Sequence, residues 1–494
     1  MPRPVNLSER ETLLLVSNRE PYEHVRTPDG LEIRRPAGGL VSALDPTMSQ
    51  LRGTWVAWGS GSADAEHADE HGRLAVPPED PRYTLRRIWL DEADIERYYL
   101  GFANSVLWPL CHGLPQHLRF LDRDWERYVA VNERFAAAVL DEAARADREP
   151  VVWVHDYHFA LLPAVLRAKR PGLFVHQFWH IPFPSPYALR EIPAAVREGI
   201  LRGLLGNDLL AFQTDHDVQN FLESVITLDG VTIDGESVVS LADGRRVTVR
   251  AFPISIDVAH YEALARTPDS ELRVKDLRQR YGRKGRELGV CVDRVDYTKG
   301  IPERLRALDL LWSKWPELRT RFTFIIVATP SRTELAVYRE LEEEMLAEVA
   351  SINLRYGTAD WTPIVLINDN VDAALLAVIY RAADLCVVSS LQDGMNLVAK
   401  EFIACQLEEG GALILSRYAG AAQQIEGAVL IDPRDASAFA DGIREGFAMS
   451  RTERRERMHA MRLALKRNTI FHWLADLQGT VQGLRVARAA AVIA

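Results

Sequence analysis

The sequence predicts an α/β protein made of two doubly wound domains that face each other across a cleft. Three observations support this fold class. The chain has 494 residues, enough for two or three domains. Short apolar runs alternate with helical patterns along most of the chain, as in proteins built on parallel sheets. The runs form two series, separated by a charged helical stretch at residues 261–286.

The first series predicts the parallel sheet of an N-terminal domain, residues 1–257. Each run is continuously apolar, which is typical of strands that are buried on both faces. The predicted strands are residues 13–16, 151–154, 174–179, 209–212 and 249–254.

The second series predicts a similar domain at residues 258–494. Its strands are expected at residues 288–292, 322–327, 364–367, 385–388 and 412–415. Residues 451–485 have the pattern of charged helices, and the last helices can pack back on the N-terminal domain.

Composition excludes several classes of partner. Lys and Arg total 59 and Asp and Glu total 69, which gives a net charge of −10. An acidic chain is poorly suited to wrap nucleic acid or bind an anionic membrane. No apolar run has the length of a membrane span or a secretory signal, so we expect a cytoplasmic protein. Its cysteines are expected to be buried and reduced: Cys111, Cys291, Cys386 and Cys405.

Polar residues follow the predicted strands of the first domain, where ligands bind in doubly wound sheets. Arg19 follows the first strand, Asp156 follows 151–154 and His180 follows 174–179. Titratable groups at two successive strand ends favour a ligand site, although a histidine there can also be structural. The glycine pair at 38–39 precedes a helical pattern, and it indicates either a phosphate-binding loop or an ordinary turn.

Two cations follow the first predicted strand of the second domain. Arg294 offers a planar fork and Lys299 a point charge, and together they suit a pyrophosphate. The alternative is a surface ion pair with Asp293 or Asp296.

Residues 392–401 follow the predicted strand at 385–388. Gly394 allows a tight turn before a helix whose exposed N–H groups would suit a diphosphate. Glu401 could accept hydrogen bonds from ribose hydroxyls, and Asp393 from sugar hydroxyls.

Other chemistries find little support in the sequence. Asp122 and Asp124 form a DxD pattern, but it lies in a helical stretch rather than after a strand, so we expect no metal there. The sequence contains no GxSxG, GxxxxGK[ST] or HExxH motif.

Taken together, these segments resemble the trehalose-6-phosphate synthases and their relatives, the glucosylglycerol-phosphate synthases. The resemblance runs from residue 13 to about residue 481. It is carried by SNR at 17–19, GGL at 38–40, YY at 98–99, LWP at 107–109, WVHDYH at 153–158, HIPFPSP at 180–186, DRVDYTKGIPERL at 293–305, PSR at 330–332, WTP at 361–363, DGMNLVAKEF at 393–402 and SRYAGAA at 416–422.

This resemblance implies a GT-B fold of two Rossmann-like domains and a retaining, metal-independent glycosyltransferase. Glucose would pass from UDP-glucose to glucose 6-phosphate and give α,α-trehalose 6-phosphate. No cofactor is implied, because UDP-glucose is a substrate. A separate phosphatase would act on the product, in a pathway of osmotic protection. A homo-oligomer is compatible with the sequence.

The resemblance also implies roles for individual residues. The catalytic residues would be Arg294, Lys299, Asp156 and His180. The acceptor would be bound by Arg19, Tyr99, Trp108, Asp156 and Arg332. The donor would be bound by Gly38, Gly39, His180, Arg294, Lys299, Val371, Asp393, Gly394, Met395, Asn396, Leu397, Val398 and Glu401.

Several positions depart from the family pattern and leave the acceptor open. Gln392 stands where arginine is common, and Gln424 where glutamate is common. The EPY at 20–22 is closer to the glucosylglycerol-phosphate synthases, which favours glycerol 3-phosphate as the alternative acceptor. A cyclitol phosphate acceptor is a third alternative. A catalytically silent protein that only binds sugar phosphates is a fourth, although Arg294, Lys299, Asp393 and Glu401 are all present.

Overall fold

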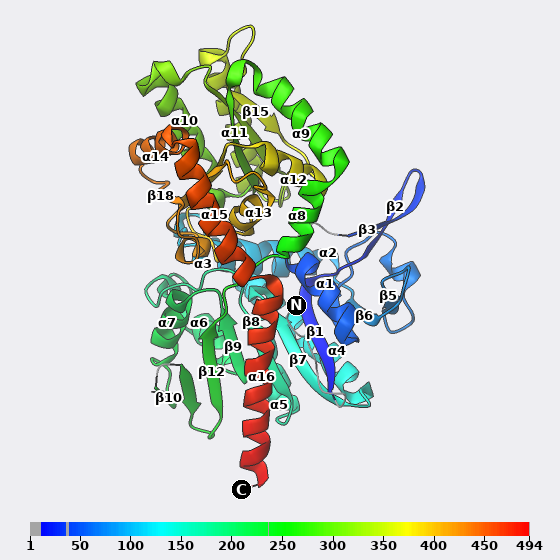
Figure 1. The fold of residues 1–494 in the computed structure, drawn as a ribbon. Coiled ribbons are helices and arrows are strands. Elements are labelled where there is room, and N and C mark those ends of the chain that lie inside the picture. Colours follow the sequence, from blue (N-terminus) through cyan, green and yellow to red (C-terminus); the bar gives the residue numbers. More distant parts are fainter. Residues whose placement is uncertain (1–10, 36–38, 236, 494) are drawn as a thin grey trace. The chain divides into compact units, whose positions relative to one another are not determined.

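The computed structural model describes residues 11–35, 39–235 and 237–493, which fall into two compact units (Figure 1). Unit 1 extends to Pro253 and includes the chain from Phe471 onward, and unit 2 is Ile254–Ile470. The boundary drawn from the sequence, between residues 257 and 258, therefore lies inside unit 2. Residues 471–494 also group with unit 1, which agrees with the expectation that the last helices can pack back on the N-terminal domain.

The last helix, α16 (Ile470–Ile493), explains this grouping. Trp473 donates its indole N–H to the carbonyl of Phe252 at 3.0 Å, and its ring packs 5.2 Å from that of Phe178. Farther along the helix, Arg488 binds Asp208 at 3.0 Å. In Figure 1, α16 (red) runs along the sheet of unit 1.

Unit 1 is built on a sheet that has ten strands within the described residues, in the order β10-β11-β12-β9-β8-β7-β1-β4-β6-β5. The seven strands from β12 to β6 are parallel, and β5, β10 and β11 add antiparallel edges. The strands are β1 (Glu11–Arg19), β4 (Gly53–Trp58), β5 (Arg73–Val76), β6 (Tyr83–Ile88), β7 (Glu149–His155), β8 (Phe174–Phe178), β9 (Leu209–Phe212), β10 (Val231–Asp234), β11 (Val238–Leu241) and β12 (Arg246–Ala251).

The other elements in the described residues of unit 1 are helices and a hairpin. The hairpin pairs β2 (Glu23–Thr27) with β3 (Gly30–Arg34). Besides α16, the helices are α1 (Gly39–Leu51), η1 (Asp64–His67), α2 (Glu92–Asp94), η2 (Ile95–Leu107), α3 (Trp108–Cys111), η3 (Pro115–His117), α4 (Asp122–Arg145), η4 (Tyr157–Phe159), α5 (Leu162–Lys169), η5 (Ala188–Glu191), α6 (Ala194–Leu204) and α7 (Asp215–Val225).

Unit 2 is a parallel sheet with six strands in its described residues, in the order β15-β14-β13-β16-β17-β18. The strands are β13 (Glu287–Arg294), β14 (Phe322–Thr329), β15 (Ile364–Ile367), β16 (Leu385–Val388), β17 (Ala412–Ser416) and β18 (Val429–Ile431). The helices are α8 (Val258–Arg266), α9 (Pro268–Tyr281), η6 (Arg283–Gly285), η7 (Tyr297–Lys299), α10 (Ile301–Lys314), η8 (Pro316–Leu318), α11 (Ala336–Tyr356), α12 (Ala373–Ala382), α13 (Leu397–Cys405), η9 (Gly420–Gln423), α14 (Ala436–Ala448) and α15 (Arg451–Arg467).

Each apolar run predicted as a strand overlaps a strand of the two sheets, although residues 252–254 of the run at 249–254 lie beyond the end of β12. The reason is burial on both faces: Leu14, Val152 and Val290, for example, are at most 1% exposed. The doubly wound fold class is confirmed. Strand β6 was missed because Arg86 and Arg87 interrupt its apolar pattern, although Arg87 is buried. Among the described residues, no helix has both the length and the apolarity needed to cross a membrane.

Candidate active site

The strand order of each sheet reverses at one point, and the candidate residues gather there. In unit 2 the order reverses between β13 and β16, and in unit 1 between β1 and β7. Helices leave such a point in opposite directions, so that ligands bind beyond the carboxyl ends of the two strands. Arg294 ends β13 and Arg19 ends β1. Asp393 follows β16 in the same way, and Asp156 follows β7.

In unit 2, Lys299 and Asp393 meet at this point. Lys299 ends the short helix η7, and its Nζ lies 2.6 Å from Oδ2 of Asp393, with both side chains 13% exposed. Gly300 then adopts a φ of +63°, and a Cβ there would lie 2.2 Å from the carbonyl oxygen of Ser389. Only glycine lets the loop after β13 come this close to β16. Lys299 therefore pairs with Asp393 and not with the Asp293 or Asp296 of the alternative interpretation.

A buried arginine, rather than Lys299, forms the ion pair with Asp293. Arg304, on α10, is fully buried and binds Asp293 at 2.5 Å and the hydroxyl of Ser389 at 2.7 Å. It also donates to the carbonyl of Lys299 at 3.4 Å. The sequence analysis did not single out Arg304, because a charge inside a helical pattern normally indicates a solvated face.

Asp296 brings Arg294 and Arg332 together. The carboxylate is fully buried, and its Oδ2 lies 2.9 Å from Nη1 of Arg332 and 3.8 Å from Nη2 of Arg294. Burial alone would raise the pKa of Asp296, but Arg332 and Arg294 outweigh it and hold that pKa well below its usual range. Arg294 thus forms an ion pair with Asp296, as the alternative to pyrophosphate binding predicted. Its side chain nevertheless stays 43% exposed.

Asp393 is held in a fixed orientation by its own loop. Its Oδ2 accepts hydrogen bonds from Oγ of Ser390 at 3.0 Å and from Nδ2 of Asn396 at 3.1 Å, in addition to the pair with Lys299. Asn396 has a φ of +75° and caps α13 by accepting from the amide of Ala399 at 3.3 Å. The loop therefore couples the carboxylate to the start of the helix.

The N-terminus of α13 lies where the sequence predicts an anion-binding element. Leu397 and Val398 form its first turn and are half-buried. Amides in a first turn lack acceptors within the helix and carry its positive partial charge. Gly394 and Met395 are buried ahead of this turn, and the carbonyl of Met395 accepts from the amide of Ala421 at 2.8 Å.

Glu401 lies farther along α13 between two phenols. Tyr261 donates to its Oε1 at 2.9 Å and Tyr380 to its Oε2 at 3.1 Å. Burial raises the pKa of Glu401, and the two phenol hydrogen bonds oppose this rise. Neither tyrosine was predicted, because Tyr261 is 140 residues away in sequence and only folding brings it here.

Unit 2 also contains the last predicted donor residue, Val371, and the two positions that depart from the family pattern, Gln392 and Gln424. Val371 is half-buried in the loop between β15 and α12, and Gln392 is half-buried after β16. Gln424 accepts from Nζ of Lys400 at 2.6 Å, and so does the carbonyl of Ile254. Burial between these two neutral oxygens lowers the pKa of Lys400 to about 7.

In unit 1, Arg19 and Tyr99, two of the residues predicted to bind the acceptor, lie together. Nη2 of Arg19 lies 3.4 Å from the hydroxyl of Tyr99. Tyr99 belongs to η2, a helix with π-type hydrogen bonds, which are unusual and often occur near functional sites. Its ring stacks on that of His158 with a centroid distance of 6.0 Å. Arg19 itself is exposed.

Trp108 forms part of the wall behind this site. It begins α3, is 5% exposed and packs 5.8 Å from the ring of Tyr157. Tyr157 in turn donates to Asn104 at 2.9 Å. Only a small edge of the indole can reach a ligand, so the predicted contact of Trp108 with the acceptor depends on that edge.

Asp156 and His180 are joined across two strand ends. Asp156 has a φ of +72°, a conformation that costs roughly 1–3 kcal/mol for a residue other than glycine. Its amide donates to the carbonyl of Phe178 at 2.7 Å, and its Oδ1 accepts from the amide of His180 at 3.1 Å. These bonds hold Asp156 in its strained conformation beside His180.

The glycine pair is only partly described. Gly38 lies outside the described residues, and Gly39 is the first residue of α1. The predicted position of the pair ahead of a helix is therefore consistent with α1.

A buried charge network that the sequence analysis missed lies directly behind Arg19. Glu20 is fully buried and binds Nε of Arg87 at 2.7 Å, and Arg87 also contacts Asp64 at 2.8 Å. Burial, aided by Asp64, raises the pKa of Glu20 to about 9. Through its bond to Arg87, Glu20 anchors the end of β1.

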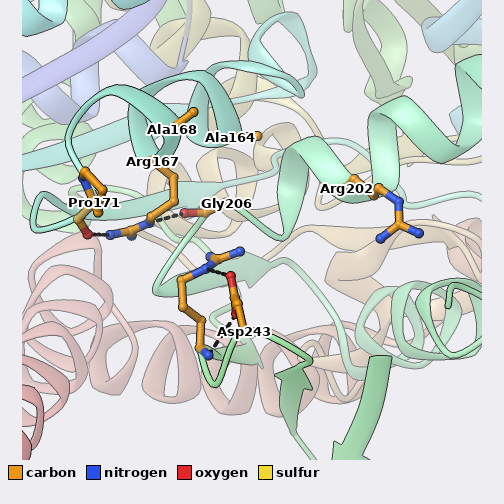
Figure 2. A pocket seen from close by; sticks show the side chains of 8 residues that line it. Ala164, Arg167, Ala168, Pro171, Arg202, Gly206 and Asp243 are labelled. Atoms are coloured by element: carbon orange, nitrogen blue, oxygen red, sulfur yellow. Dashed lines mark hydrogen bonds and ion pairs between the residues drawn. The ribbon is translucent and has the colours of Figure 1, made fainter. Parts of the chain in front are cut away.

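A surface cavity of about 380 Å³ lies elsewhere in unit 1 (Figure 2). It is lined by residues such as Arg167, Gly206 and Arg245, which lie near the amino ends of β8, β9 and β12. Figure 2 shows Arg167 bound to Gly206 and Pro171, and Arg245 is paired with Asp243. The cavity is therefore at the opposite edge of the sheet from Asp156, and its cations already have partners.

Metal-binding side chains do not converge in the described part of the chain: no group of three or more His, Cys, Asp or Glu is arranged to hold an ion. Asp122 and Asp124 of the DxD pattern lie in the first turn of α4. All four cysteines are buried and none forms a disulfide.

Comparison with known proteins identifies the family. The model of the family described as glycosyltransferase family 20 matches residues 11–482. The chain belongs to this family. It is a glycosyltransferase, and the expected resemblance is confirmed.

The chain is similar to an α,α-trehalose-phosphate synthase (UDP-forming) from Pichia angusta, with 36% identity over 93% of this chain and 97% of that protein. Its structure is similar to that of a trehalose-6-phosphate protein from E. coli bound with UDP-2-fluoro glucose. The TM-score is 0.84 at 29% identity, over 95% of this chain and 98% of the other. A Burkholderia xenovorans α,α-trehalose-phosphate synthase (UDP-forming) in complex with glucose 6-phosphate gives a TM-score of 0.83 at 30% identity, over 95% and 100% of the two chains. The predicted GT-B fold is thereby confirmed.

Proposed function

We propose that this family 20 glycosyltransferase transfers glucose from UDP-glucose to glucose 6-phosphate, with retention of configuration, and forms α,α-trehalose 6-phosphate and UDP. The observation that carries the proposal is the group Arg294, Lys299 and Asp393 beside the N-terminus of α13, at the strand-order reversal of unit 2. The similarity to UDP-forming trehalose-phosphate synthases over nearly the whole chain supports the substrates.

The donor would lie on unit 2. Arg294, Lys299 and the first amides of α13 would neutralise the diphosphate, while Asp393 would accept from hydroxyls of the transferred glucose. Glu401 would accept hydrogen bonds from the ribose hydroxyls. Each of its carboxylate oxygens still has a lone pair that is not used by Tyr261 or Tyr380. Val371, Met395 and Gly394 would contact the donor nearby, and His180 of unit 1 would contact its sugar.

The acceptor would lie on unit 1. Arg19 would bind the phosphate, Tyr99 and Trp108 would pack on the sugar, and Asp156 would bind its hydroxyls. Binding of the acceptor phosphate by Arg332 stays a prediction. Its Nη1 already donates to Asp296 and Tyr338, so it would have to use another nitrogen or exchange a partner.

Catalysis would rest on charge stabilisation and positioning rather than on a protein nucleophile. The acceptor hydroxyl would attack the anomeric carbon on the face from which the diphosphate departs, and an oxygen of the leaving diphosphate would take its proton. Arg294, Lys299 and the helix amides would stabilise the charge that develops there. We propose that no metal is needed, because these groups already supply positive charge.

A second acceptor, glycerol 3-phosphate, is favoured by the EPY at 20–22. Release of UDP from UDP-glucose, measured with glucose 6-phosphate, glycerol 3-phosphate, glucose or no acceptor, separates the two. Release with glucose 6-phosphate alone supports the proposal, and release with glycerol 3-phosphate alone replaces the product. If no nucleotide is released with any of these acceptors, and ADP-glucose and GDP-glucose also fail as donors, the result would favour a silent binding protein.

The product would be a phosphate monoester, which a separate phosphatase could hydrolyse to the free disaccharide. We propose that the protein acts in the cytoplasm, where nucleotide sugars and sugar phosphates are found. A chelator such as EDTA should leave UDP release unchanged, and a loss restored by a divalent cation would overturn the metal-independent mechanism.

A further inference from the structure

His155 and His180 form a hydrogen-bonded pair of imidazoles in unit 1. His155 ends β7 and is fully buried, whereas His180 follows β8 and is half-buried. Nδ1 of His155 lies 3.0 Å from Nε2 of His180, and the rings stack with an angle of 20°. His155 has no role in the proposed function, yet it contacts the ring proposed to meet the donor sugar.

Both rings are neutral near pH 7. Burial lowers the pKa of His180 to about 3, and burial together with the neighbouring His180 and His176 lowers that of His155 well below its usual range. The nearby His176 is also neutral, since burial lowers its pKa to about 3. A hydrogen bond between two neutral imidazoles contains a single proton, so one ring donates and the other accepts.

The burial of His155 indicates which ring donates. If His155 accepted at Nδ1, its own proton would be on Nε2, which is buried and contacts no hydrogen-bonding group of the described residues. A buried N–H without an acceptor is less common in proteins than an under-used acceptor atom. With the proton on Nδ1, the N–H of His155 is satisfied by His180.

We infer that His155 is a positioning residue that donates its Nδ1–H to Nε2 of His180 and so fixes His180 as the Nδ1–H tautomer. His180 then presents an N–H donor on the nitrogen that is not used in the pair. That donor suits a hydroxyl oxygen of a sugar and cannot remove a proton from it. The inference deepens the proposed function, because it states how His180 meets its ligand.

The tautomer can be read directly, without substrate. Full-length protein with ¹⁵N-labelled histidine is measured by long-range ¹H–¹⁵N correlation, and His180→Gln assigns the signals of His180. We expect a pyrrole-type Nδ1 and a pyridine-type Nε2 in His180, unchanged between about pH 6 and pH 8, where unperturbed histidines titrate. A pyrrole-type Nε2, or a protonated ring, overturns the inference.

Two substitutions of His155 test its effect on turnover. His155→Asn keeps an N–H donor near the position of Nδ1, whereas His155→Phe keeps ring bulk and removes the donor. The Asn variant should retain the tautomer of His180 and most of kcat. The Phe variant should give mixed tautomers and a kcat lower by about tenfold or more, with an unchanged acceptor KM.

His176→Phe is the matched control, because His176 is a buried histidine of the adjacent strand that makes no hydrogen bond to His180. It should leave the tautomer of His180 unchanged. If His155→Phe does not fold, the spectra of the wild type and of His155→Asn still show which tautomer His180 adopts. If the expected tautomer is found but His180→Gln leaves kcat unchanged, the proposed sugar contact fails and the donation from His155 stands. Equal kcat in the Asn and Phe variants overturns the positioning role.

Discussion

The two units have the same strand order around their reversal points but present different chemistry there. Unit 2 places Arg294, Lys299 and Arg332 around two carboxylates at the ends of β13 and β16. Unit 1 places an exposed arginine among aromatic rings and neutral imidazoles. The shared fold therefore determines where a ligand can bind, and the residues after each strand determine what kind of ligand it is.

This difference matches two tasks. A departing diphosphate needs positive charge in a partly dehydrated site, where electrostatic stabilisation is strongest. A sugar needs flat apolar faces and a few oriented donors and acceptors. Three substitutions test whether the tasks are divided in this way, and a fourth tests the stability of unit 2, from the largest expected effect to the smallest.

Lys299→Ala should lower kcat by about 100-fold to 1000-fold, because Lys299 is one of few groups that oppose the charge of the leaving diphosphate. Steady-state UDP release measures this. Lys314→Ala is the control, since Lys314 is also a lysine of unit 2 but contacts only surface groups such as Ser437 and Asp441. A loss below about tenfold, equivalent to about 1.4 kcal/mol, would contradict the role of unit 2.

Asp156→Asn should lower kcat/KM for the acceptor by about 10-fold to 100-fold, since hydrogen bonds to a charged group are worth about 1.5–3 kcal/mol. Asparagine has nearly the same shape as aspartate, so it should be no more strained at this φ, and it can still accept from the amide of His180. Thermal unfolding should therefore change little. A large fall in stability with unchanged kinetics would instead make Asp156 a structural residue.

Arg19→Ala should raise the KM for glucose 6-phosphate by about tenfold and leave kcat nearly unchanged, because a lost charged hydrogen bond to the phosphate weakens binding by about that factor. Arg202→Ala is the control in the same unit, since Arg202 lines the cavity of Figure 2 and pairs with Glu198. If the control raises the acceptor KM and Arg19→Ala does not, the phosphate binds at the other edge of the sheet.

Lys400 should give unit 2 a small pH dependence of stability. Its pKa is about 7 in the folded protein and about 10.4 when unfolded, so the unfolded chain holds the extra proton between these values. Stability should therefore rise as pH increases from about 7 toward 10. The melting temperature of wild type relative to Lys400→Met should increase by about 2 °C or more from pH 7 to pH 9.

Gln424→Glu sharpens this test, because a carboxylate beside Nζ would raise the pKa of Lys400 and flatten the dependence. A melting-temperature difference between wild type and Lys400→Met that is constant with pH would show that Lys400 is charged throughout the range.

The sequence by itself determined the framework of the protein. Continuous apolar runs predicted most of the central parallel strands, since strands buried on both faces require them, and polar residues at the strand ends marked both reversal points. Strand β4, which pairs with β1, was missed although it too is apolar. The motifs around Asp156, Lys299 and Asp393 were also readable, because each lies within a few residues of its strand.

Only the tertiary structure decided which of these residues meet. Lys299 pairs with Asp393, Arg332 shares Asp296 with Arg294, and Glu401 lies between two distant tyrosines. The edge strands and the buried Glu20–Arg87 pair were equally unpredictable. For α16 the sequence allowed a return to the first domain, and the structure decided it. The physical reason is the same in each case: a partner far along the chain supplies the hydrogen bond or charge, and local patterns contain no record of it.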